Sequence, residues 1–193
     1  MITIEPNRTA LLVMDLQMTV VALYAEKVAP LLERAAGVIA AARKARLPII
    51  YVVVSFRPGY PEISPRNLTF AALSQSGRLV SATPGSDIAP EVRPQEGDIV
   101  VVKRRVSAFA GTDLEIILRA KGIDTLVLLG VATGGVILST VRHGADADYR
   151  LVVVKDGCAD ADDEVHRVLT EKVLVRQATV ISASEVTAAL QRV

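Results

Sequence analysis

The sequence is poor in cysteine, histidine and aromatic residues. Its 193 residues contain one cysteine (Cys158), two histidines (His143 and His166) and no tryptophan. A single cysteine excludes an intrachain disulfide, and the histidines lie far from any zinc-ligand spacing, so we expect no metal site. Aromatic residues make up only 4% of the chain, which argues against a surface that stacks on bases or sugars.

An excess of charge of either sign is also absent. The chain has 22 basic and 21 acidic residues and a net charge of +1, so we expect no nucleic-acid partner. No apolar stretch approaches the length that spans a membrane, and Glu5, Pro6, Asn7 and Arg8 stand where a secretory signal needs an apolar core. We therefore expect a cytoplasmic protein without a membrane partner, which binds small molecules or copies of itself.

Hydrophobic residues are abundant, at 51% of the chain. This content and the chain length suggest one domain over residues 1–193 with one sizeable core. Short, continuous apolar runs rich in β-branched residues are typical of strands buried on both faces of a parallel sheet. Six such runs are present, at residues 10–14, 49–54, 99–102, 126–129, 151–154 and 179–181.

Helical patterns separate these runs. Apolar residues repeat at helical spacing between residues 31 and 42. Further helices are expected over residues 112–122, 135–147, 162–173 and 184–191, and we interpret His143 and His166, which fall on two of them, as surface or packing residues. Strands that alternate with helices predict a doubly wound α/β fold.

Residues 56–97 depart from this alternation. The segment contains six prolines, and we expect a long ordered excursion with little regular structure. Loops of this length within a compact domain are usually functional or interfacial.

The residues that follow the predicted strands suggest a site, because ligands bind at the carboxyl ends of strands in an open parallel sheet. The first run ends in Asp15-Leu16-Gln17 and the third in Lys103, while residues 130–135 form a glycine-rich turn after the fourth. If these strands are neighbours, Asp15 and Lys103 meet beside a helix N-terminus that can bind an anion or a carbonyl oxygen. An acid–base site and a structural ion pair are both compatible with this spacing.

Four segments at the strand ends carry a family resemblance. They are TALLVMDLQ from residue 9, VKRRVSAFAGTDL from residue 102, DTLVLLGVAT from residue 124 and VKDGCA from residue 154. In order and separation they resemble the isochorismatase-like (cysteine hydrolase) superfamily over nearly the whole chain. The resemblance implies a three-layer α/β/α fold around a six-stranded parallel sheet with strand order 3-2-1-4-5-6.

The resemblance also implies a catalytic set. Family members use an aspartate after the first strand, a lysine after the third and a cysteine in the turn after the fourth. The first two correspond to Asp15 and Lys103, whereas Val136 occupies the position of the cysteine, which closes the acyl-enzyme route. Isochorismatases proper have glycine there and use the aspartate as proton donor to a vinyl ether, and Cys158 matches a structural cysteine of many members.

Further site residues follow from the same resemblance. It implies a cis peptide bond between Val131 and Ala132 and backbone oxyanion donors in the turn, which comprises Val131, Ala132, Gly135 and Val136. It implies substrate contacts from four residues, namely Gln17, Ser107, Phe109 and Thr133. Two alternatives stay open: Gln17 as a plain loop residue and Phe109 as a core residue. Thr133 is also expected to cap the following helix and thereby shape the turn.

Our leading hypothesis is a hydrolase of a small carboxylated or amide-bearing metabolite, without metal or cofactor, in a homo-oligomer such as a dimer or tetramer. The alternative is a non-catalytic small-molecule-binding or assembly protein that retains the fold. A dinucleotide-dependent oxidoreductase is disfavoured, because the first strand ends without the glycine fingerprint that lets a pyrophosphate approach the helix.

Overall fold

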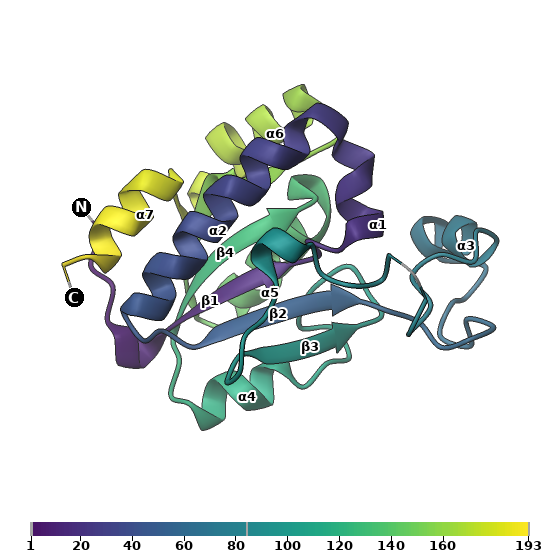
Figure 1. The fold of residues 1–193 in the computed structure, drawn as a ribbon, viewed down its shortest axis with the longest axis horizontal. Helices are drawn as coiled ribbons and strands as arrows, with labels where there is room; N and C mark the ends of the chain where they lie inside the picture. The colour runs from purple at the N-terminus through teal and green to yellow at the C-terminus, as the bar shows by residue number, and fades with distance from the viewer. Residues whose placement is uncertain (1, 84, 193) are drawn as a thin grey trace.

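The computed structural model describes residues 2–83 and 85–192, and its centre is a six-stranded parallel sheet (Figure 1). The strand order is β3-β2-β1-β4-β5-β6. This order and the flanking helices confirm the predicted fold class. The strands are β1 (Thr9–Met14), β2 (Ile49–Val54), β3 (Ile99–Lys103), β4 (Thr125–Val131), β5 (Arg150–Ala159) and β6 (Thr179–Ile181).

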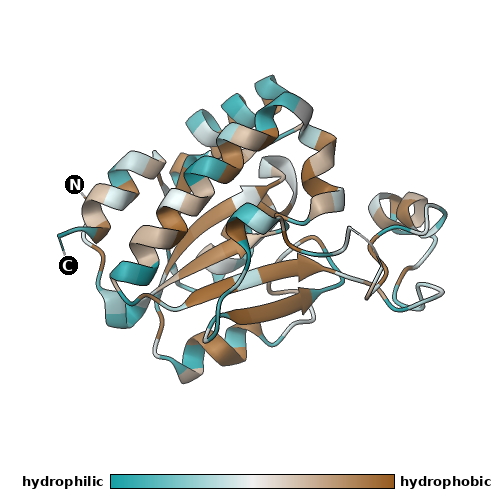
Figure 2. Cartoon of the chain, viewed as in Figure 1, coloured by the Kyte–Doolittle hydropathy of each residue, from teal (hydrophilic) through white to brown (hydrophobic). Residues whose placement is uncertain are grey.

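Alternate side chains of the strands enter two separate cores, one on each face of the sheet. Leu11 and Val13 of β1 join the core under α2 (Val28–Lys44) and α7 (Ala183–Leu190). Leu12 and Met14 join the core under α4 (Leu114–Ala120) and α5 (Leu138–Asp146). Figure 2 shows the apolar strands enclosed between these helices, which explains why the strands appear in the sequence as unbroken apolar runs.

The helices after β4 and β5 are less regular than the sequence predicts. The helix expected at 135–147 begins with a π-helical segment, η4 (Thr133–Ile137), in which Gly135 has non-helical backbone angles. The helix expected at 162–173 is divided into α6 (Asp163–Val168), the π-helical η5 (Leu169–Val173) and a short 3-10 helix, η6 (Leu174–Arg176). Three more 3-10 helices are η1 (Pro6–Arg8), η2 (Ala22–Lys27) and η3 (Pro90–Val92), and α1 (Met18–Val21) follows β1.

The excursion between β2 and β3 has more structure than predicted. It carries α3 (Leu68–Ser74), whose N-terminus is capped by the side chain of Asn67. Phe70 of this helix packs edge-on against Phe56, with ring centroids 5.3 Å apart. These rings and Leu79 belong to a third, smaller core. Figure 1 shows α3 at the end of a projecting arm, which we define as residues 57–83.

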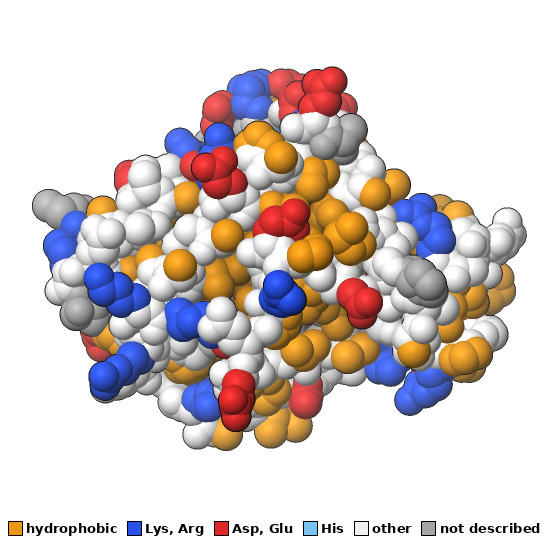
Figure 3. Space-filling model, viewed as in Figure 1, with side chains coloured by type: hydrophobic (Ala, Val, Ile, Leu, Met, Phe, Trp, Pro, Cys, Tyr) orange, Lys and Arg blue, Asp and Glu red, His pale blue; other side chains and the backbone are white. Residues whose placement is uncertain are grey.

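The arm lies between β2 and β3 in the chain, where a crossover helix is expected, but it projects beyond the ends of these strands and does not cover β3 (Figure 1). Val101 is buried in the α4/α5 core, but Val100 and Val102 point to the opposite face and are 49% and 38% exposed. Figure 3 shows hydrophobic side chains gathered in the middle of the face that carries α2. Among the described residues, no helix is both long and apolar enough to cross a membrane.

Gly130 allows β1 and β4 to approach closely at their carboxyl ends. Its φ is +131°, and a Cβ atom built on it would lie 2.0 Å from the carbonyl oxygen of Met14. We expect Gly130→Ala to lower the free energy of unfolding by about 3 kcal/mol, because the strands must move apart and the backbone is strained. Urea denaturation of the two proteins measures this difference.

Gly37 provides the matched control, because it lies exposed within α2 and a Cβ built there meets nothing within 4 Å. Gly37→Ala should raise the free energy of unfolding by about 0.5–1 kcal/mol, since alanine loses less backbone entropy in a helix. Equal effects of the two substitutions would show that the close approach at Gly130 does not limit stability.

Candidate active site

Asp15 and Lys103 meet at the carboxyl edge of the sheet, although β2 lies between their strands. The Lys103 Nζ lies 2.8 Å from Asp15 Oδ2, and the two side chains are 3% and 7% exposed. Asp15 has a φ of +56° and donates its backbone N–H to the Val52 carbonyl of β2. Lys103 Nζ also donates to the carbonyl of Arg105. The structure therefore brings together the two residues that were predicted to meet at this edge of the sheet.

The second carboxylate oxygen of Asp15 is the unusual atom of this pair. Oδ1 is buried and has no hydrogen-bond partner among the described residues. Burial raises the pKa of Asp15, while the charge and hydrogen bond of Lys103 oppose that rise. A buried, unpaired polar atom is costly, so this oxygen distinguishes the pair from an ordinary, fully satisfied ion pair.

Gln17 holds the end of β1 to its surroundings. Its amide nitrogen donates to the carbonyls of Val54 (3.1 Å) and Ser86 (2.7 Å), and its oxygen accepts the Val54 N–H (2.8 Å). The side chain is fully buried. These contacts give Gln17 a structural role between β2 and the returning excursion, and its contact with substrate stays a prediction.

The turn after β4 forms the other side of the site. The peptide bond between Val131 and Ala132 is cis, as the family resemblance implied. The Gly135 N–H donates to the Ala132 carbonyl at 3.1 Å, so this donor is engaged within the turn. A Cβ atom on Gly135 would lie 4.0 Å from the side chain of Val106, which places the loop after Lys103 against the turn. Val136 is 2% exposed and packs in the α4/α5 core.

Side chains from the β5–α6 region hold this turn in place. The Oγ1 of Thr133, a fully buried residue, hydrogen-bonds to Nδ1 of His166 at 2.8 Å. The Gly134 N–H donates to Asp160 Oδ2 at 2.6 Å. The expectation that Thr133 caps the following helix is wrong, because its hydroxyl binds His166 and no side-chain cap is formed. Neither Asp160 nor His166 was predicted as a site residue, and His166 was expected only as a surface or packing residue; they lie 26 and 33 residues from Gly134 and Thr133.

Ser107 and Phe109 lie in the loop after Lys103. Phe109 is 5% exposed and stacks on His143, with centroids 4.5 Å apart. These contacts support the core alternative for Phe109. The Ser107 Oγ accepts the Phe109 N–H at 3.3 Å, and its contact with substrate stays a prediction.

Cys158 lies on β5, opposite Gly130 of β4, and is 5% exposed. Burial raises the pKa of its thiol to about 12, and a protonated thiol is a poor nucleophile. Within residues 2–83 and 85–192, no cluster of three His, Cys, Asp or Glu side chains could hold a metal ion.

A three-layer α/β/α fold with a buried Asp–Lys pair beside the β4 turn defines a class of small α/β hydrolase-like proteins. Residues 9–185 match the family described as Isochorismatase domain. The chain therefore belongs to the isochorismatase family of hydrolases.

The relatives agree with this assignment. The chain is 32% identical to the uncharacterized isochorismatase family protein YwoC from Bacillus subtilis, over 86% of this chain and 85% of that protein. It is 29% identical to maleamate amidohydrolase from Pseudomonas putida, over 75% of this chain and 67% of that protein. The crystal structure of a cysteine hydrolase from Pseudomonas syringae pv. phaseolicola superposes with a TM-score of 0.91 at 25% identity, covering 100% of this chain and 96% of that chain.

The burial of the ion pair makes its stability effect testable. In Lys103→Met, the Asp15 carboxylate stays buried without its counter-charge, and we expect a loss of about 3–5 kcal/mol of unfolding free energy at neutral pH. Without Lys103, the pKa of Asp15 in the folded state lies further above its value in the unfolded state. The loss of unfolding free energy therefore grows as the pH rises above the unfolded-state pKa and shrinks as the pH falls towards it. Urea denaturation at pH 5 and pH 8 measures both effects.

The Asp15→Asn/Lys103→Met double variant is the control, because it removes both charges. It should unfold at higher urea than Lys103→Met at pH 8, with little pH dependence between the two conditions. A Lys103→Met protein within about 0.5 kcal/mol of wild type, as for an ordinary surface substitution, would contradict the buried ion pair.

Proposed function

We propose that this protein hydrolyses a small carboxylated or amide-bearing metabolite, with Asp15 as the proton-transfer group and Lys103 as its electrostatic partner. The observation that carries the proposal is the buried Oδ1 of Asp15, which has no partner in the described residues while Oδ2 is held by Lys103. A carboxylate fixed in this way at a sheet edge, beside a turn of backbone N–H groups, is suited to general acid–base catalysis.

The raised pKa of Asp15, caused by its burial, favours the route that begins with proton donation. For a vinyl ether such as isochorismate, the protonated Asp15 gives its proton to the terminal enol carbon. Water adds to the resulting cation, and the hemiketal breaks down to pyruvate and an alcohol as the proton returns to Asp15. Lys103 stabilises the carboxylate that exists between these two transfers.

An amide substrate requires the reverse order of proton transfers. Since Val136 offers no nucleophile, water must attack the carbonyl, and Asp15 accepts its proton as general base. The proton then passes to the leaving ammonia. The similarity to maleamate amidohydrolase supports testing this class of substrate.

A second candidate function is ligand binding or assembly without catalysis. Val136 favours it, because a buried apolar side chain stands at the position that the resemblance assigns to the nucleophile. Tight binding of a ligand without turnover, unaffected by Asp15→Asn, is the result that this function requires.

The first test is pyruvate release from isochorismate, coupled to lactate dehydrogenase. We expect wild-type turnover and a decrease of about 10²-fold or more in Asp15→Asn, because the amide cannot transfer the proton. Asp146→Asn is the matched control, since it makes the same chemical change at an exposed position of α5, and it should keep wild-type activity.

The outcomes separate the candidates. Wild-type turnover that survives in Asp15→Asn would contradict the assigned role of Asp15. Without turnover of isochorismate, ammonia release from maleamate and related small amides is measured on the same variants. If the wild type releases neither pyruvate from isochorismate nor ammonia from the amides, the hydrolase proposal is overturned and the non-catalytic function is supported.

A further inference from the structure

The turn after β4 is supported by a polar cluster that the proposed chemistry does not use. We call it the turn clamp and define it as Lys27, Thr133, Gly134, Asp160 and His166. His166 binds the Thr133 hydroxyl, and Asp160 accepts the Gly134 N–H. Lys27 donates from its Nζ to the backbone carbonyl of Asp160, which fixes the loop that carries this carboxylate.

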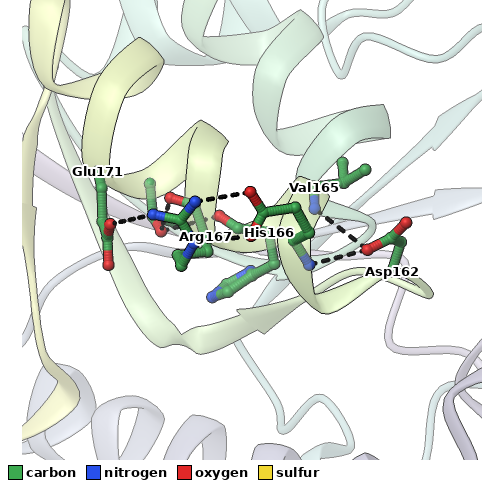
Figure 4. A network of polar contacts seen from close by, with 7 residues as sticks. Asp162, Val165, His166, Arg167 and Glu171 are labelled. Carbon is green, nitrogen blue, oxygen red and sulfur yellow. Dashed lines mark hydrogen bonds and ion pairs between the residues drawn. The ribbon is translucent and has the colours of Figure 1, made fainter.

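The elements around the clamp hold His166 in a defined place. Asp162 caps α6 by accepting the backbone N–H groups of Glu164 and Val165. One turn further along, Arg167 pairs with Glu171 at 3.0 Å (Figure 4). His166 lies between these contacts on a well-anchored helix, so α6 fixes the place of its backbone, and its ring is bound to Thr133 of the turn.

Solvent and protons reach His166 through a cavity. It has a volume of about 410 Å³ and lies between the start of α2 and α6, where Lys27, Asp160, Asp163 and His166 contribute to its wall. On the other side of the imidazole, Thr133 is fully buried. The imidazole therefore separates an accessible cavity from the buried base of the turn.

The protonation state of His166 determines which atom donates in its bond to Thr133. In the neutral ring with a proton on Nε2, Nδ1 accepts from the Thr133 hydroxyl. In the protonated ring, Nδ1 becomes a donor and the hydroxyl proton must find another acceptor, which a fully buried threonine cannot obtain from bulk water. The neutral ring is thus the state that satisfies both groups.

Among the described residues, three charged groups act on the pKa of His166, and Glu26, Arg34 and Asp156 line the same cavity. Asp160 precedes α6, Asp163 lies on α6 itself, and Lys27 projects from η2 and pairs with Asp163. Burial lowers the pKa of His166 and Lys27 adds to this effect, whereas the two aspartates oppose it. The net lowering favours the neutral ring near neutral pH.

We propose that neutral His166 is a positioning residue of the candidate active site, which holds the β4 turn through Thr133 and releases it when protonated. The inference deepens the proposed function, because it assigns a pH-dependent support to the turn of that site. His166 acts only through Thr133 and contacts no reacting atom in this assignment. Loss of the neutral acceptor at Nδ1 displaces the backbone N–H groups of residues 134–136.

Amide NMR spectra test the proposal independently of any substrate. The wild type is compared with His166→Asn, whose Oδ1 can accept from Thr133 but does not titrate, and with His166→Leu, which has no acceptor. His143→Gln is the matched control, since His143 is the other histidine of the chain and lies exposed against Phe109. Far-UV circular dichroism and thermal unfolding report whether each variant is folded.

In the wild type, the amide resonances of Thr133, Gly134 and Gly135 should shift between pH 8 and pH 5 with the same midpoint as the His166 ring. His166→Asn should keep the pH 8 positions of these resonances and lose their titration. His166→Leu should show displaced resonances at every pH, and His143→Gln should titrate as the wild type does. Thr133→Val should displace the same resonances as His166→Leu, because it removes the other partner of the bond.

The proposal is overturned if the turn resonances titrate in His166→Asn as in the wild type, or stay constant while the His166 ring titrates. Activity adds a second readout once turnover is found. His166→Leu should then lower kcat by about tenfold or more with KM little changed. His166→Asn should restore most of kcat. It should also remove the fall of kcat at acidic pH that comes from protonation of His166. Absent turnover would reject the proposed hydrolase function and leave the NMR result to decide the role of His166.

Discussion

The buried ion pair between Asp15 and Lys103 is the constraint on which the rest of the site depends. Removing two charges from water is expensive, and their attraction offsets that cost only when the geometry is well held. The fold meets this requirement from several directions: the N–H of Asp15 binds β2, and Gln17 fastens the end of β1 to the end of the same strand. The close approach of β1 and β4 at Gly130 brings the turn after β4 next to the end of β1, which carries Asp15.

The two sides of the site differ in chemical character. The Asp15–Lys103 side is polar and carries one carboxylate oxygen without a partner among the described residues. In the turn, by contrast, Val136 is apolar and its side chain is buried. The proposed chemistry therefore uses proton transfer and water as the nucleophile, not a covalent intermediate. The Thr133 hydroxyl and the Gly134 N–H are bound by His166 and Asp160, so side chains outside the turn hold it in place.

Much of the fold could be predicted from local pattern. Each of the six apolar runs lies in a strand of the sheet. Burial on both faces explains the continuous apolar sequence of the central strands, whereas the edge strands β3 and β6 are partly exposed. The position of Asp15 and Lys103 at strand ends followed from the same pattern. The contacts of Thr133 with His166 and of Gly134 with Asp160 could not be predicted. They join segments 33 and 26 residues apart, and neither His166 nor Asp160 lies in one of the four family segments. The α3 helix was missed because prolines dominate the segment around it.

The arm also affects how the site is assembled. The segment from Ser55 to Asp98 separates β2 from β3, two strands that are direct neighbours in the sheet. Pairing them closes a long loop, and the entropy of that closure must be offset before β3 gains any contact. Lys103 is the last residue of β3. Its place beside Asp15 therefore requires β3 to pair with β2, so that the ion pair cannot form until this edge strand has joined the sheet.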